Sequence, residues 1–293
     1  MYKDGKLFTL YAVTSVHPGS GSNLSYVDLP IQREKHTSFP VIPGSAMKGV
    51  IRNIAMRVWN DNSKVNTYFG SQDTGETASS VAFTDAKILF YPVRSIRGIF
   101  AYVTCPYVLQ RFSNEMKSIV NNVNNEDIFV INSKINDAIA EDEIIVSHGS
   151  ELVIDTDSNN KEAGLEEYIF KVKEQINDYL VLNNMKKHIV SEVSGIEKRI
   201  AVVSDTVFND FVNYAIEIRT RIKIDQTKGT AETGALFVVE LIPSESIFYS
   251  IALFKENENA AMQDEIKKLL HNTMIQIGSD ETIGNGIMKI NYL

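Results

Sequence analysis

A chain of 293 residues with 44% hydrophobic content is long enough to bury a substantial core, which excludes a wholly disordered protein. Cys105 is the only cysteine, so an intramolecular disulfide and a four-cysteine zinc site are excluded and a reducing, cytoplasmic setting is expected. The apolar run near the start is too short to span a bilayer, and no small-residue cleavage site follows it. We therefore expect no export signal and no membrane segment.

The net charge of −8 argues against a protein that coats nucleic acid non-specifically. Residues 29–60 differ from this average, because five basic residues and one acidic residue give them a local charge of +4. The rest of the chain therefore sums to −12. An acidic protein with one basic face would bind RNA along that face and repel it elsewhere.

The N-terminal part of the chain alternates strand and helix patterns. Residues 6–16 are rich in β-branched and aromatic types and predict a buried first strand. Apolar spacing after residue 45 predicts a helix with Ser45 as its N-cap. Two strand candidates follow at 82–93 and 100–110. This order resembles the first half of a ferredoxin-like βαββαβ unit.

The middle of the chain is less regular. Residues 61–80 are mostly polar and predict a surface loop. The region 111–200 mixes short amphipathic helices with a strand candidate and is interpreted as an insertion.

The last third has clearer periodicity. Residues 204–214 begin with a capping serine and predict a helix. Alternation over 216–225 and a returning apolar run at 235–241 predict a long hairpin. A strand, a helix over 259–273 and two short strands close the chain. The order favours an α+β fold, either two ferredoxin-like halves or one such core with an insertion and a hairpin.

Asp28 is the first candidate for chemistry. It lies in the stretch VDLPIQRE at 27–34, and the prolines in and after this stretch stiffen the loop enough to hold a carboxylate in one place. The carboxylate could act on bound RNA directly, as a base toward a 2′-hydroxyl, or through a divalent cation. The alternative is an aspartate that stabilises a turn, as most loop aspartates do. No cluster of carboxylates surrounds it in the sequence, which argues against a two-metal site.

Two histidines stand close to this segment in the sequence. His17 ends the first strand, and an imidazole that titrates near neutrality is a natural proton-transfer partner, although it could equally cap the turn. His36 lies among the basic residues Arg33 and Lys35, and we expect these three side chains to bind phosphate rather than to move protons.

The predicted helix at 45 offers an anion site. Lys48 and Arg52 are four residues apart and share one face, while Ser45 lies where backbone N–H groups are free at the helix start. The alternative is an ordinary solvated helix face.

Two further elements could contact RNA. The loop GSDETIGNG at 278–286 allows backbone N–H groups to approach a phosphate, because Gly278, Gly284 and Gly286 have no side chain. It lacks the lysine of a Walker loop. The predicted hairpin projects Arg219 and Arg221, together with a lysine, from one face, although a charged outer face is common on edge hairpins.

The block from His17 to Arg52 and the glycine-rich loop together resemble the RAMP superfamily. The nearest likeness is the target-cleaving backbone subunit of type III-B CRISPR effector complexes, the Cmr complexes. This resemblance implies a single RAMP domain over 1–293. Its ferredoxin-like (RRM-like) core would comprise about 1–110 and 200–293, with the insertion at 111–200 and a protruding thumb hairpin at 216–242.

The resemblance also implies roles for particular residues. Asp28 would be required for cutting target RNA with the help of a divalent metal, expected to be Mg²⁺, and the product would carry a cyclic phosphate. The helix with Lys48 would lie along the guide RNA. The thumb would displace one nucleotide per subunit. Ser279 and the surroundings of Glu240 depart from the family pattern, which leaves their roles open.

The implied partners are a CRISPR guide RNA, a target single-stranded RNA, further copies of the chain in a helical filament and other subunits of the complex. Two alternatives remain open. The chain could be a structural RNA-binding filament subunit that does not cut, or it could be an endonuclease that processes guide precursors. The motif VDLPIQRE at 27–34 argues against the processing enzyme, and only Asp28 separates a target-cutting subunit from a structural one.

Overall fold

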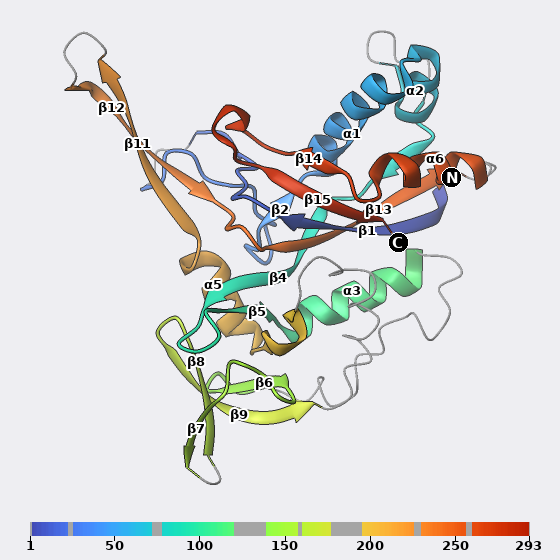
Figure 1. Cartoon of the computed structure of the whole chain (residues 1–293). Helices are drawn as coiled ribbons and strands as arrows, with labels where there is room; N and C mark the ends of the chain where they lie inside the picture. The colour runs from blue at the N-terminus through green and yellow to red at the C-terminus, as the bar shows by residue number, and fades with distance from the viewer. Residues whose placement is uncertain are drawn as a thin grey trace.

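The structure is a computed structural model that combines a large mixed sheet with helices on both of its faces and one projecting hairpin (Figure 1). It describes residues 2–22, 26–71, 78–119, 139–157, 160–176, 195–225, 230–255 and 260–292. Within these ranges, no helix has the length and apolar character needed to cross a membrane.

Four strands form the centre of the sheet in the order β15-β1-β13-β4, and every neighbouring pair is antiparallel. Helix α1 follows the first of these strands along the chain, and α6 connects the third to the fourth. This is the ferredoxin-like arrangement, so the predicted core is confirmed as one unit rather than two halves. The bounds are β1 Tyr2–Ala12, α1 Gly44–Trp59, β4 Ala86–Arg94, β13 Ile247–Lys255, α6 Ala260–Leu270 and β15 Ile287–Tyr292.

One strand of this core was assigned wrongly from the sequence. The third core strand is β13, whereas the candidate at 100–110 forms β5, Phe100–Thr104, on the outer edge of β4. The apolar run then continues as helix, because Pro106 opens α3, Pro106–Ile119. Helices α1 and α6 lie on one face of the sheet and α3 covers the opposite face (Figure 1).

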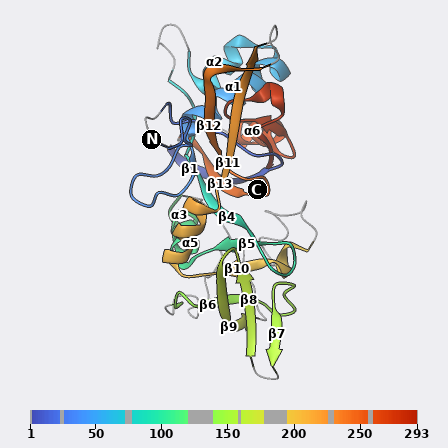
Figure 2. The ribbon, with the colours of Figure 1, turned by 90° about the vertical axis from the view of Figure 1, so that its left-hand side faces the viewer.

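The region predicted as an insertion continues the same sheet. Beyond β5 the strand order is β10-β6-β9-β8-β7, which lengthens the molecule at the end away from α2 (Figure 2). Residues 120–138, 158–159 and 177–194 of this region lie outside the described residues. The strand bounds are β6 Glu143–Ser147, β7 Ile154–Asp157, β8 Asn160–Leu165, β9 Tyr168–Ile176 and β10 Ile200–Val202, and the short helix η2 covers Ile196–Lys198.

The loop predicted over 61–80 is partly wrong, because α2 occupies Asn62–Phe69. The Asp61 carboxylate caps this helix by accepting from the Lys64 N–H at 3.0 Å. Val65 and Phe69 then bury one helical face. A polar stretch can form a helix when its few apolar residues fall at helical spacing. The short strand β3, Val81–Phe83, follows.

The start of α1 differs from the sequence-based expectation. The helix begins at Gly44 with Pro43 as its N-cap, so Ser45 is not the capping residue. The cap comes from outside, because the Gly44 N–H donates to Asp85 Oδ1 at 2.7 Å. A side chain at Gly44 would lie 2.4 Å from the Phe83 carbonyl oxygen, so this close approach requires glycine.

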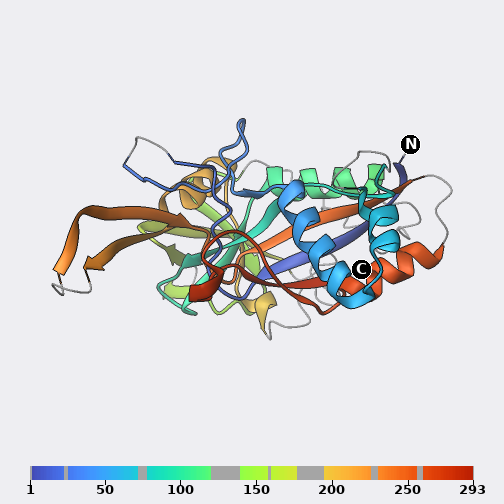
Figure 3. The ribbon, with the colours of Figure 1, turned by 90° about the horizontal axis from the view of Figure 1, so that it is seen from above.

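The thumb hairpin consists of β11, Glu217–Asp225, and β12, Thr230–Leu241, and forms a separate two-stranded sheet. It projects from the body of the protein (Figures 1 and 3). Its return strand starts five residues before the predicted 235–241 run. The remaining elements are β2 Val41–Ile42, α5 Asp205–Tyr214, β14 Met274–Gln276 and the short helix η3 Glu281–Ile283.

Candidate RNA interface

Asp28 lies at the base of the thumb hairpin. Its carboxylate Oδ2 accepts a hydrogen bond from the Val238 N–H at 2.8 Å. The next residue pairs with β12 in parallel, because the Leu29 N–H donates to Val238 O at 3.1 Å and the Glu240 N–H donates to Leu29 O at 3.0 Å. No local sequence pattern predicts that Asp28 and Val238, 210 residues apart, are in contact.

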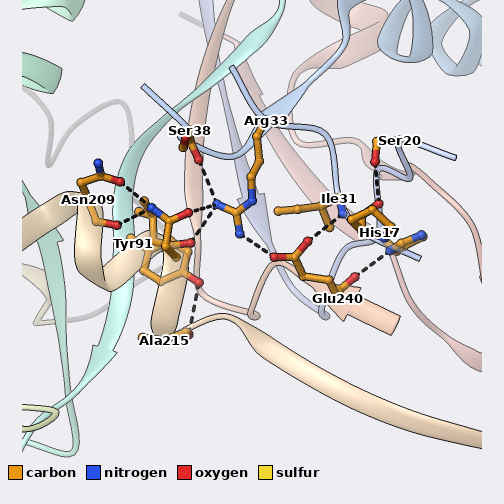
Figure 4. Close-up of polar contacts among 12 residues, drawn as sticks. His17, Ser20, Ile31, Arg33, Ser38, Tyr91, Asn209, Ala215 and Glu240 are labelled. Carbon is orange, nitrogen blue, oxygen red and sulfur yellow. Dashed lines mark hydrogen bonds and ion pairs between the residues drawn. The ribbon is translucent and has the colours of Figure 1, made fainter. Parts of the chain in front are cut away.

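Arg33 and Glu240 form a half-buried ion pair at the same place, with Arg33 Nη2 2.6 Å from Glu240 Oε1 (Figure 4). The Arg33 guanidinium also donates to the carbonyl oxygens of Ser38 at 2.9 Å and Val212 at 3.0 Å, and to Asn213 Oδ1 at 3.1 Å. Four acceptors therefore hold its charged group inside the protein. The predicted phosphate contact of Arg33 stays a prediction, and these bonds indicate a structural role.

His17 is 4% exposed, and its Nδ1 lies 2.7 Å from the carbonyl oxygen of Glu240. A carbonyl oxygen can only accept, so Nδ1 carries the hydrogen of this bond. This bond connects the first turn to the thumb base (Figure 4). A proton-transfer role for His17 stays a prediction, since the observed bond is structural.

Lys35 and His36 are both exposed at the tip of a turn. The turn is closed by a bond from the Ser38 N–H to Glu34 O at 2.9 Å. Its stem is fixed to α3, because Arg111 Nη1 donates to both carboxylate oxygens of Glu34 at 2.9 and 2.7 Å. The two predicted phosphate-binding side chains therefore project from a rigid support.

On α1, Ser45 is exposed and Lys48 is half-buried. Burial, followed by the neighbouring Arg52 charge, lowers the pKa of Lys48. Arg52 turns toward α2, where it donates to Gly70 O at 2.5 Å and to Asn66 Oδ1 at 2.7 Å. The helix thus presents Ser45 and Lys48 to a ligand more readily than Arg52.

The two faces of the thumb hairpin differ in character. Ile222 pairs with Leu236 across the strands, and both share a face with Ile218, because residues two apart and residues in register point the same way. All three side chains are 45–63% exposed. Sequence periodicity had indicated a half-buried strand. A hairpin without a second layer leaves this apolar face uncovered.

Arg219 and Arg221 lie on the opposite face, against the glycine-rich loop. Arg219 donates to Glu217 Oε1 at 2.5 Å, Ser15 Oγ at 3.3 Å and Asn285 Oδ1 at 3.2 Å. Arg221 Nη1 lies 2.8 Å from Asp280 Oδ2, and this bond lowers the pKa of the Asp280 carboxyl. The RNA-binding role predicted for both arginines stays untested, while their contacts hold the loop against the thumb.

The glycine-rich loop packs on the turn that follows β1. Gly278 has φ +88°, and a Cβ there would lie 2.3 Å from the His17 carbonyl oxygen. The Gly286 N–H donates to Ser15 O at 2.8 Å. The glycines therefore allow a close approach within the protein, and Gly278 is also exposed for a ligand.

We expect Gly286→Ala to lower the free energy of unfolding by about 3 kcal/mol, because its φ is +81° and a Cβ would lie 2.1 Å from the Ile277 carbonyl oxygen. Gly284→Ala is the matched control, since its φ is +80° but no atom lies within 4 Å of a Cβ. It should cost about 1 kcal/mol. Urea unfolding of both variants measures the difference, and equal costs would contradict the packing argument.

The donor set around Asp28 fits a shared cation rather than a dedicated metal site. The described ranges contain no group of three or more His, Cys, Asp or Glu side chains that could hold a metal. Asp28 is partly exposed, and its Oδ1 has no hydrogen-bond partner among those residues. Mg²⁺ is often held by one or two carboxylates together with substrate phosphates.

Comparison with known proteins settles the family. A model of the RAMP superfamily matches residues 9–289. The chain belongs to the RAMP superfamily. Among curated RAMP relatives, the chain is 39% identical to the CRISPR system Cmr endoribonuclease Cmr4 of Pyrococcus furiosus, over 97% of this chain and 94% of the relative. The Cmr4 subunit of Saccharolobus solfataricus is 27% identical over 98% and 96% of the two chains.

Solved RAMP structures agree with this assignment. Oligomeric Cmr4 from Pyrococcus furiosus superimposes with a TM-score of 0.74 at 31% identity, covering 99% of this chain and 98% of that one. A chain of the type III-B Cmr-β complex bound to cognate target RNA superimposes with a TM-score of 0.78 at 26% identity, with 99% and 98% covered. The resemblance to Cmr backbone subunits inferred from the motifs is thereby confirmed.

Proposed function

We propose that this chain is a guide-RNA-binding backbone subunit of a type III-B CRISPR effector complex, and that it is the endoribonuclease that cuts paired target RNA at regular intervals. The 39% identical relative is named a Cmr endoribonuclease, which supports RNA cleavage. The motif VDLPIQRE is intact at 27–34. Each copy would cut once, beside its own Asp28.

The observation that carries the proposal is the hydrogen bond between Asp28 and Val238. It joins the carboxylate to the strand of the thumb hairpin. If the thumb displaces one nucleotide of the guide–target duplex, the phosphodiester next to that nucleotide would lie beside Asp28. A hairpin and a carboxylate fixed to each other would set the position of the cut.

The chemistry that suits a single carboxylate is attack by the neighbouring 2′-hydroxyl. The 2′-oxygen forms a bond to phosphorus as its proton passes to the Asp28 carboxylate. The bond from phosphorus to the 5′-oxygen breaks, and this leaving oxygen takes a proton from water. The products are a 2′,3′-cyclic phosphate and a 5′-hydroxyl.

A divalent cation, expected to be Mg²⁺, would be held by Asp28 together with the target phosphate. When bound, it would neutralise negative charge that develops on the phosphate oxygens. In this alternative the Asp28 oxygen that Val238 does not occupy would hold the cation instead of taking the proton, and the 2′-hydroxyl proton would pass to water.

The guide RNA would follow the exposed polar groups around this centre. Ser45, Lys48 and the start of α1 suit one phosphate, and Lys35 and His36 at the turn tip suit another. At Gly278, on the far side of the thumb base, a phosphate would approach the backbone N–H groups closely, because no side chain blocks it.

Self-association and companion subunits are part of the proposal. One structural relative is an oligomeric Cmr4, and others are chains of type III-B complexes. Copies would contact each other head to tail through a heterologous interface, which builds a helical filament until other subunits end it. The complex would act in the cytoplasm.

The test is cleavage of an end-labelled target RNA by the complex assembled on a guide, with Mg²⁺ or with a chelator. We expect cuts at regular intervals with Mg²⁺, cyclic phosphate ends on the products, and loss of cutting in the chelator. Undiminished cutting in the chelator would contradict the metal requirement. A target that binds but is never cut would make the chain a structural filament subunit.

A guide-processing enzyme would behave differently, because the isolated chain would cut repeat RNA. We expect no such activity, since cutting here depends on the assembled guide–target duplex. Incubation of the purified chain with repeat RNA is the measurement.

A further inference from the structure

Glu240, on β12, contacts four separate groups of the N-terminal loop that carries Asp28. Its Oε1 pairs with Arg33 at 2.6 Å, and its Oε2 accepts from the Ile31 N–H at 2.9 Å. Its carbonyl oxygen accepts from His17 Nδ1 at 2.7 Å, and its N–H donates to Leu29 O at 3.0 Å. The Glu240 side chain is 10% exposed.

These contacts leave the carboxylate little freedom. Both oxygens already accept hydrogen bonds, one of them from a cation, and the group is almost enclosed. A proton carrier must reach the substrate directly or through one water. Glu240 is two residues from Val238, which binds Asp28, so it could be taken for a second catalytic group. Its enclosed and fully bonded carboxylate indicates a structural support instead.

We propose that Glu240 is a positioning residue that fixes the thumb hairpin relative to Asp28, an inference that rests on the proposed function. The Asp28 carboxylate is bonded to Val238 on the same strand. Glu240 fixes the loop on both sides of Asp28, through His17 before it and Ile31 and Arg33 after it. The hairpin and the carboxylate would then move together, and the cut position would follow the hairpin.

Arg33 extends this support to α5. Besides Glu240, its guanidinium donates to Val212 O and Asn213 Oδ1, which lie on the helix that leads into β11. Both strands of the hairpin are thus tied to the loop, β12 directly and β11 through α5. Loss of the Glu240 charge would leave the enclosed Arg33 cation without its counter-charge and loosen both connections.

Glu34, the residue after Arg33, supplies a matched control. Glu34 also forms an ion pair with an arginine, Arg111, and the two side chains are 10% and 11% exposed. This pair connects the loop to α3 and does not touch the thumb. Glu34→Gln and Glu240→Gln therefore make the same chemical change at comparable burial, but only the second affects the hairpin.

The first experiment is hydrogen exchange on the full-length chain without RNA. We expect Glu240→Gln to raise the exchange rates of three backbone amides about tenfold, because a bond to a charged group is lost. These are the amides of Leu29, of Val238 and of residue 240 itself. Glu34→Gln should leave these amides at the wild-type rate. Unchanged protection in Glu240→Gln would overturn the proposal without any reference to activity.

The second experiment is cleavage by the assembled complex over a range of pH. Glu240→Gln should reduce the single-turnover cutting rate about tenfold and spread the cuts over adjacent positions, with target binding and the shape of the pH profile unchanged. Loss of one limb of the pH profile would instead make Glu240 a proton carrier and overturn the proposal. Glu34→Gln should keep the wild-type cut positions.

Two controls separate the possible failures. If Glu240→Gln does not fold, Arg33→Lys keeps the charge but cannot reach the four acceptors, and it should give the same spread of cuts. If Asp28→Ala still cuts, the proposed function fails. If Asp28→Ala is inactive while Glu240→Gln and Arg33→Lys both keep wild-type rates and cut positions, only the positioning role fails.

Discussion

Asp28→Ala should reduce cutting of bound target RNA by at least about 10²-fold while the complex still binds the target. Asp28 is partly exposed and fills no core position, so its removal costs one hydrogen bond, to Val238, and little packing. Under the proposed function, binding would be spread over guide pairing and several phosphate contacts, none of which would need this carboxylate. Single-turnover cleavage and target titration, measured on the same preparation, separate the two effects.

Asp28→Asn is the sharper variant. Its amide oxygen can still accept from the Val238 N–H, so the loop keeps its connection to β12. The amide can neither take a proton at neutral pH nor hold a cation as a carboxylate does. We expect it to be as inactive as Asp28→Ala. Full activity in Asp28→Asn would show that the residue only supports the loop.

Mixed complexes add a third check. If every copy cuts beside its own Asp28, complexes assembled from wild-type and Asp28→Ala chains should keep the spacing of the cuts. The yield at each position should fall in proportion to the mutant fraction. Loss of one position alone would mean that a single copy, or another subunit, performs the chemistry.

The parts of the fold that the sequence predicted are those that depend on local spacing. The helix after Gly44, the helix at 204–214 and the thumb hairpin follow periodicities that lie within a dozen residues. Their ends were less accurate. Ser45 looked like an N-cap, but the N–H at the start of α1 is satisfied by Asp85, which lies 41 residues after Gly44 and is invisible to local reasoning.

The pairing of distant segments could not be read from local patterns. The third core strand is β13, separated from β4 by the whole insertion, and both β5 and β13 look like apolar strands in the sequence. Which of the two strands becomes the third core strand depends on whose apolar face packs against α1 and α6. That is a property of the packed core, which a window of residues does not contain.

The candidate site was only partly predicted, because its contacts also join segments that are distant in the sequence. The motif pointed to Asp28, but Val238, which binds its carboxylate, acts through a backbone N–H that has no sequence signature. Arg33 looked like a phosphate ligand because its neighbours are basic. In the structure its charge is matched by Glu240, 207 residues later, while the phosphate contact stays a prediction. Charge counting locates a basic segment, but it cannot tell which members turn inward.

The second large effect is expected on the apolar face of the thumb hairpin. The double variant Ile222→Asn with Leu236→Asn should reduce target cutting at least about tenfold, since burial of one Ile or Leu side chain against a base contributes roughly 1.5–3 kcal/mol. These two side chains are 53% and 63% exposed and pair across the strands, so the hairpin should keep its fold. Cleavage assays and thermal unfolding of the variant measure both expectations.

Ile169→Asn on β9 is the matched control, because Ile169 is 56% exposed but belongs to the sheet extension and not to the thumb. It should leave cutting unchanged. Equal losses in the control and the thumb variant would mean that exposed apolar side chains matter in some general way, such as assembly of the filament.

Salt dependence decides which face of the thumb meets the RNA. An apolar face that contacts bases neutralises no phosphate, so the double variant should keep the wild-type slope of target affinity against salt concentration. If the basic face made the contact, Arg219→Ala would flatten that slope. We expect Arg219→Ala to keep the slope and lower stability instead, because its guanidinium bonds Ser15, Glu217 and Asn285. A flattened slope in Arg219→Ala with wild-type cutting in the double variant would reverse the assignment of the two faces.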